Sequence, residues 1–135
     1  MSRFVHQRKL TPAALGLDAV TLAAERTSSV IDLTGASRLA LYFDFTRSAY
    51  TAIAISVDFC PDEAADYAQY FEQSVSIASG TATMSDFSFA RTISASKKLC
   101  LRLKDLDAVS AKIRVSATAG GASDLVTVKA IVSED

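Results

Sequence analysis

The chain of 135 residues contains few of the residues on which enzymatic chemistry most often depends: one histidine, two cysteines and no tryptophan. His6 lies near the N-terminus, so neither a histidine-based catalytic triad nor a histidine-rich metal site can be built on the folded body of the chain. The five glycines are scattered and form no phosphate-binding loop after a strand. We therefore expect a protein that is not an enzyme and that has no catalytic residues, no metal site and no cofactor.

The two cysteines, Cys60 and Cys100, are too few for a disulfide framework. Both fall opposite the apolar positions of their segments, so a bridge between them is a geometric alternative. Free thiols are the expected state in a reducing compartment.

Long apolar runs are also missing, because no run approaches the roughly 20 residues that span a bilayer. The first residues, MSRFVHQRK, carry positive charge without an apolar stretch behind it, which is not the pattern of a secretory signal. We expect no membrane partner and synthesis in a cytoplasm.

The formal net charge is −1, which argues against a nucleic-acid partner because such binding relies on a basic excess. The charges are nevertheless segregated along the chain. Two interpretations stay open: ordinary solvated faces, or an acidic end of one molecule that meets a basic end of another. The acidic residues are Asp58, Asp62, Glu63, Asp66 and Glu72, and the basic ones are Lys97, Lys98, Arg102, Lys104, Lys112 and Arg114.

Strict alternation of apolar and polar residues is the strongest pattern present. It is clearest from Leu39 to Phe45 and from Ile53 to Phe59, and it indicates strands with one buried face. We predict an all-β fold: a single jelly-roll-like β-sandwich of eight to nine antiparallel strands. The expected strands begin at Val20 and Leu22 and at 30–33, and continue at about 38–46, 51–60, 83–93, 97–105, 111–119 and 124–133, with 67–78 less clearly marked.

Residues 1–17 show no strand alternation and are expected to form an extended N-terminal arm, with the sandwich domain at 18–135. Thr11-Pro12 has the residue types that begin a short helix. A second short helical turn is expected after Pro61, because Asp62 and Glu63 would lie in its first turn.

Two binding functions also have to be considered. The cluster Asp58, Asp62, Glu63 and Asp66 offers oxygen ligands for calcium, although its spacing is not that of an EF-hand loop. Tyrosines could form a sugar-binding platform, or they could simply pack within the fold. They are Tyr42, Tyr50, Tyr67 and Tyr70.

Several segments together resemble the small structural proteins of tailed bacteriophages. They are 29–35, 39–46, 53–59 followed by Pro61-Asp62, 113–120 and 126–130. The resemblance covers about residues 28 to 133 and consists of strand style and turn order, without a short diagnostic motif. It implies a single jelly-roll domain that decorates or cements a capsid, with the major capsid protein or other virion proteins as partners. It also implies residence on the capsid surface and a homo-oligomer, with a trimer favoured.

A cement protein needs a rigid core and exposed contact elements that bury surface on neighbouring subunits. The candidate contacts are Arg3, Phe4, Val5, Arg8 and Lys9 in the arm and Asp62, Glu63 and Asp66 in the acidic turn. The alternatives are a neck or tail adaptor or fibre-base protein and, in a different class, a sugar- or calcium-binding sandwich module.

Overall fold

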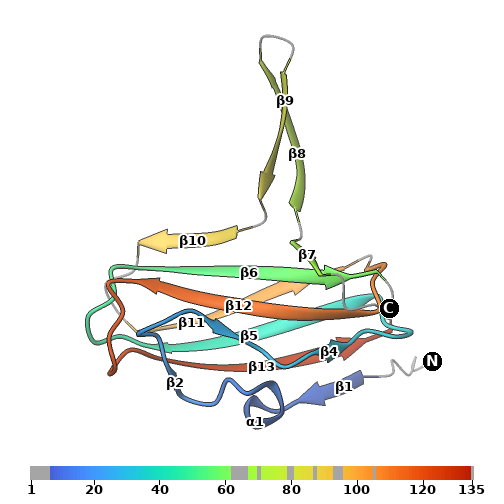
Figure 1. The fold of residues 1–135 in the computed structure, drawn as a ribbon. Helices are drawn as coiled ribbons and strands as arrows, with labels where there is room; N and C mark the ends of the chain where they lie inside the picture. The colour runs from blue at the N-terminus through green and yellow to red at the C-terminus, as the bar shows by residue number, and fades with distance from the viewer. Residues whose placement is uncertain are drawn as a thin grey trace, which may run out of the picture.

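The fold is a sandwich of two antiparallel sheets from which a third, two-stranded sheet projects (Figure 1). A computed structural model describes residues 7–61, 67–69, 71–78, 81–86, 88–92, 96–104 and 106–134. Within these ranges, only the backbone is described at 69, 71–78, 81–86 and 88–92.

The first sheet has five strands, and its longest members are adjacent to one another. Its order is β1 (Gln7–Leu10), β13 (Leu125–Ser133), β5 (Arg38–Thr46) and β11 (Lys97–Leu103). The short strand β2 (Val20–Thr21) also pairs with β13. We call it sheet A; β11 and β1 lie at its two edges.

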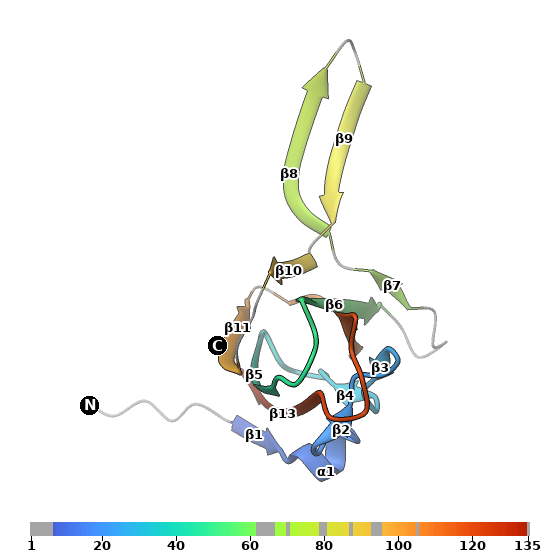
Figure 2. The same cartoon turned by 90° about the vertical axis from the view of Figure 1, so that its left-hand side faces the viewer.

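The second sheet has six strands and faces the first across the core (Figure 2). In this sheet, called sheet B, β6 (Ala52–Cys60) pairs with β12 (Ser110–Thr118) along its whole length. On its other side β6 pairs with β7 (Ala68–Gln69) and β10 (Ser88–Thr92). The short strands β3 (Arg26–Thr27) and β4 (Ile31–Asp32) both pair with β12.

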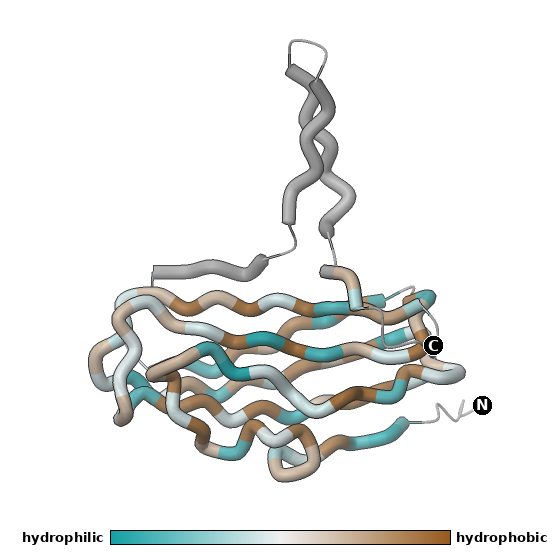
Figure 3. The backbone as a smooth tube through the Cα atoms, viewed as in Figure 1, coloured by the Kyte–Doolittle hydropathy of each residue, from teal (hydrophilic) through white to brown (hydrophobic). Residues whose placement is uncertain are grey.

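The core lies between the sheets and is built by the alternation that the sequence displays. Along β5 the residues Leu39, Leu41, Phe43 and Phe45 are buried while their neighbours are not. The same pattern runs through β6, β12 and β13, and Figure 3 shows it as alternating colour along the tube. Phe43 and Phe45 stack with ring centroids 5.9 Å apart, and Tyr50 meets Phe45 edge to face. The predicted all-β sandwich is confirmed.

The region that follows β6 differs from the expectation of one strand over 83–93. Two strands occupy it: β9 (Thr81–Asp86), which pairs with β8 (Phe71–Ala78), and β10, which returns to β6. The β8–β9 hairpin is thus an insertion between β7 and β10, two strands on the same side of β6. The predicted helical turn after Pro61 falls on residues 62–66, outside the described residues.

Residues 7–17 belong to the sandwich, in contrast to the arm predicted for 1–17. Strand β1 pairs with β13, and the helix α1 (Pro12–Leu15) follows directly. The Thr11 side chain accepts a hydrogen bond from the Ala14 N–H, which confirms the predicted helix start. Leu15 and Leu17 are buried in the core, so this part of the chain is integral to the fold.

Candidate interaction surfaces

Of the eight predicted contact residues, the structure describes two. Arg8 and Lys9 lie on β1, and both are exposed. Arg3, Phe4 and Val5 in the arm, and Asp62, Glu63 and Asp66 in the acidic turn, lie outside the described residues. Arg8 and Lys9 are therefore fixed on the edge of a sheet instead of being carried by a free arm.

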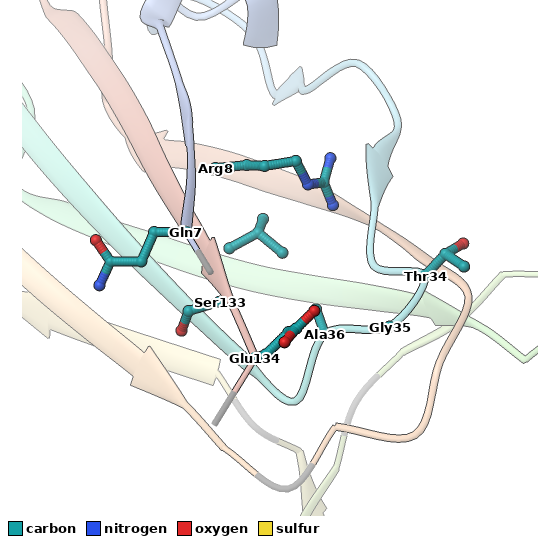
Figure 4. Close-up of a pocket in the computed structure, with 8 residues that line it drawn as sticks. Gln7, Arg8, Thr34, Gly35, Ala36, Ser133 and Glu134 are labelled. Atoms are coloured by element: carbon teal, nitrogen blue, oxygen red, sulfur yellow. The ribbon is translucent and has the colours of Figure 1, made fainter. Parts of the chain in front are cut away.

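Arg8 lines a shallow hollow beside the edge of sheet A (Figure 4). Its guanidinium donates a hydrogen bond to the Asp32 carbonyl, which ties β1 to the 32–36 turn. The Thr34 N–H donates to the Asp32 carboxylate, and this hydrogen bond lowers the pKa of Asp32. The hollow measures about 230 Å³, which is smaller than the roughly 300–1,000 Å³ of typical ligand pockets. Its other lining residues are Gln7, Gly35, Ala36, Val132, Ser133 and Glu134.

Asp58, the first member of the predicted calcium cluster, is engaged in an ion pair. Both of its carboxylate oxygens accept hydrogen bonds from Arg114, at 2.7 and 3.0 Å. The hydrogen bonds from Arg114 to Asp58 also raise the pKa of the guanidinium. Within the part of the chain that the structure describes, no group of three or more histidine, cysteine, aspartate or glutamate residues is placed to hold a metal ion.

The described tyrosines occupy three different environments. Tyr50 is fully buried, so it packs in the core and cannot serve as a sugar platform. Tyr67 forms a hydrogen bond with Ser110 through its hydroxyl, and the Lys112 ammonium lies 4.6 Å from its ring centroid. Tyr42 is half-buried on the outer face of β5. Tyr70 lies outside the described residues.

Neither Cys60 nor Cys100 forms a disulfide within the described residues, as expected, and the two thiols differ in exposure. Cys100 is exposed on β11, whereas Cys60 is buried at the end of β6. The Val109 N–H donates to the Cys60 carbonyl, so the segment leading into β12 encloses the end of β6. The alternation along β6 predicts that Cys60 faces away from the core, whereas the structure buries it at the end of the strand.

Asp124 is a buried carboxylate that sequence patterns did not single out. Its Oδ1 accepts hydrogen bonds from the N–H groups of Ser48, Ala49 and Tyr50, and its Oδ2 accepts one from Gly121. Burial raises the pKa of Asp124, but these backbone donors outweigh it and lower the pKa to about 2. The carboxylate thereby joins the β5–β6 turn to the β12–β13 turn, which is a structural role.

The β8–β9 hairpin is the most distinctive element of the surface. Figures 1 and 2 show it standing away from the sandwich, beyond β6, β7 and β10. A strand of eight residues is roughly 26 Å long at about 3.3 Å per residue, so the hairpin reaches well clear of the core. Its two strands form a separate sheet and pair only with each other.

The register of the hairpin separates two kinds of residue pair. Val75 is opposite Met84 and Ile77 is opposite Ala82, while Ser76 is opposite Thr83. The sequence predicts strands over 67–78 and 83–93 with the turn signal Ser79-Gly80 between them, but it does not predict that a hairpin in this region forms a separate sheet outside the sandwich.

No helix among the described residues is long and apolar enough to cross a membrane. The geometry thus defines an antiparallel β-sandwich protein with a projecting hairpin and a small polar hollow. No protein-family model matches the sequence, and no curated protein matches it.

Solved structures do share the fold. The chain is similar to the SPBc2 prophage-derived protein YomS, with a TM-score of 0.55 and 13% sequence identity over 99% of this chain and 98% of that one. It is also similar to a chain in the structure of infectious bursal disease virus Gx strain, with a TM-score of 0.52 and 12% identity. That match covers 98% of this chain and 33% of the viral one. At these identities the similarity establishes the fold.

Proposed function

We propose that this chain is a non-enzymatic structural protein of a tailed-phage virion, which attaches to the capsid surface and bridges neighbouring shell subunits. The observation that carries the proposal is the β8–β9 hairpin projecting from a closed sandwich. Its partners on this proposal are the major capsid protein and further copies of the chain itself, with a trimer favoured.

The physical argument starts from the stability of isolated hairpins. A two-stranded sheet in water is at best marginally stable, because it buries too little apolar surface to offset the conformational entropy lost on folding. The two-stranded sheet of β8 and β9 pairs with no other described strand, so a neighbouring subunit could cover its faces and its edges. A projecting hairpin that is covered by a partner therefore suits a protein that works by contact.

The sandwich provides what such a contact element needs at its base. β7 and β10, which flank the hairpin in sequence, are both hydrogen-bonded to β6, and β6 pairs with β12 over nine residue pairs. The hairpin is thus connected to sheet B at both of its ends. The similarity in fold to a prophage-derived protein over nearly the whole of both chains adds support, as does the similarity to a viral chain.

The mechanism is mass action. A protein that binds the assembled shell and not its separated subunits stabilises the shell by RT ln(1 + [L]/Kd) per site, and many copies act together. No chemical step is needed for this role, because the binding free energy itself stabilises the joints between subunits.

The test is to locate the protein on phage particles. Particles are induced from the strain that encodes the chain, separated into heads and tails, and probed with an antibody raised against the purified protein. Label on heads is the expected result, and label on necks or tails would favour the adaptor or fibre-base alternative. Absence of the chain from purified particles would refute the proposal.

A matched variant tests the role of the hairpin. Replacing residues 71–86 by a short Gly-Ser turn should leave the sandwich folded, since the hairpin pairs only with itself. We expect this variant to melt near the wild-type temperature and to lose particle binding. A folded variant that binds particles as well as the wild type would show that the hairpin is not the contact element.

A further inference from the structure

A cluster of positive charge lies on the outer face of sheet A, and the strand register shows how it is built. Lys9, Ile131, Ala40 and Arg102 are neighbours in one row across β1, β13, β5 and β11. The next row is Lys129, Tyr42 and Cys100, and the third is Thr127, Asp44 and Lys98. We call these three rows the basic face.

The basic face points away from the core, because the intervening residues of the same strands are buried. Val128, Ala130 and Val132 on β13 and Leu41 and Phe43 on β5 all face inward. Lys9, Lys98, Arg102 and Lys129 are exposed, and Asp44 is the single acidic residue in the three rows. Four cations thus share a small area with one carboxylate, in a chain whose net charge is −1.

Within the described part of the chain, the lysines of the basic face, Lys9, Lys98 and Lys129, have no ion-pair partner. The side chains of Cys100 and Tyr42 lie beside Arg102, and their interactions with it raise the pKa of its guanidinium. The positive potential of the face is therefore available to a partner.

We propose that the basic face is a docking surface for an acidic protein surface on a different virion subunit. The inference rests on the proposed function and deepens it, because it names the chemistry of the partner. It also gives the chain a second contact surface, which lies on sheet A. The first is the hairpin, which lies in sequence between β7 and β10 of sheet B.

The composition of the face favours a protein partner. Ile131, Ala40 and Tyr42 are half-buried and lie between the cations, so an apolar centre is bordered by charge. This is the usual anatomy of a protein–protein interface, in which an apolar core is surrounded by a polar rim. A nucleic acid would use the cations but would gain little from the aliphatic centre.

A second copy of the chain does not fit this face through a two-fold axis. A two-fold interface places the same patch on both partners, so it would bring lysine and arginine against lysine and arginine. Like charges brought together at an interface repel each other, whereas an acidic surface is electrostatically complementary.

The test uses two double variants with the same change in charge. Lys98→Gln with Lys129→Gln lowers the charge of the basic face by two units. Thr27→Glu with Thr118→Glu lowers the net charge equally, at exposed positions of sheet B. Any difference between the two variants therefore reports the position of the charge and not its total.

The first probe is poly-L-glutamate, titrated into the full chain and followed by NMR at 50 mM NaCl. In the wild type we expect chemical-shift changes confined to residues of the three rows. The lysine variant should bind poly-L-glutamate about tenfold more weakly, and the threonine variant should bind it with the wild-type affinity. Equal weakening in both variants would overturn the proposal. So would tighter binding of a dT oligonucleotide than of poly-L-glutamate, because the face would then be a nucleic-acid site.

The second probe is the purified phage particle. Loss of particle binding in the lysine variant, with retention in the threonine variant, is the expected outcome. Full particle binding by the lysine variant would overturn the proposal that the basic face is a docking surface, while the proposed function would stand. If the wild type itself does not bind particles, the proposed function fails, and the poly-L-glutamate titration still decides this inference. A wild-type dimer in light scattering that the lysine variant abolishes would assign the face to a second copy and overturn the proposal.

Discussion

The two adjacent glycines of the β12–β13 turn should respond in opposite ways to alanine. A Cβ on Gly120 would lie 2.2 Å from the Leu22 carbonyl oxygen and 3.2 Å from the Ala117 Cβ. A Cβ on Gly121 would have the Asp124 Oδ2 as its nearest neighbour at 3.7 Å, which is ordinary van der Waals contact. Neither glycine has a positive φ, so the contrast is purely one of space.

The magnitude for Gly120→Ala follows from how firmly Leu22 is held. Carbon–oxygen contacts normally begin at about 3.3 Å, so the chain segments that contain Gly120 and Leu22 must separate by roughly 1 Å. Leu22 is 2% exposed, and its N–H donates to the Asp124 carbonyl at 2.8 Å, so its backbone cannot retreat freely. Overpacking of this kind costs about 1–3 kcal/mol, which corresponds to a fall in melting temperature of roughly 3–12 °C in a domain of this size.

Thermal unfolding followed by circular dichroism measures both variants against the wild type. Gly121→Ala should stay within about 0.5 kcal/mol of the wild type, because alanine adds no clash and reduces the freedom of the unfolded chain. Equal melting temperatures for the two variants would refute the reasoning, since they would mean that Leu22 moves aside at no cost.

Three further predictions concern charge and thiols. Because Asp124 has a pKa of about 2, below its ordinary value of 3.8, its stabilisation is present above about pH 4 and is lost as the pH falls toward 2. Asp124→Asn should therefore have a lower melting temperature than the wild type at pH 7, and its melting temperature should change less between pH 6 and pH 2.5. The control Asp44→Asn, at an exposed site, should have the pH dependence of the wild type. Asp58→Asn, which weakens the partly buried pair with Arg114, should lower the free energy of unfolding by about 1 kcal/mol, measured in urea; no loss relative to the exposed control Asp107→Asn would contradict this. Ellman's reagent should titrate one thiol per native chain and two after denaturation, and Cys100→Ser should remove the native reaction; rapid reaction of that variant would show that Cys60 is accessible.

The parts of the fold that could be predicted from sequence are those in which one strand face is buried along its whole length. The predicted range 38–46 coincides with β5, 111–119 is shifted by one residue at both ends from β12, and 124–133 starts one residue before β13. In these strands the alternation of Leu39, Leu41, Phe43 and Phe45 with polar neighbours reflects directly which side chains contact the core.

Prediction failed where burial depends on segments distant in the chain. Residues 7–17 have no alternation, yet Leu15 and Leu17 are buried because α1 and the residues after it lie along β13. Asp124 reads as an ordinary turn residue, and only the meeting of two turns surrounds it with four backbone donors. The candidate contacts were sought in charged runs of sequence, whereas the hairpin and the basic face are products of topology.

The sequence by itself therefore determined the class of fold and the residues of the central core, because period-two alternation is a local property of each strand. Only the tertiary structure decided which surfaces exist. Lys9 on β1, Lys98 and Arg102 on β11, and Lys129 on β13 come from three distant parts of the chain, and they become neighbours through the register of these strands with β5. The hairpin projects because β7 and β10 both pair with β6 and leave the residues between them outside the sandwich. Strand order and register are set by long-range pairing, which no local pattern encodes.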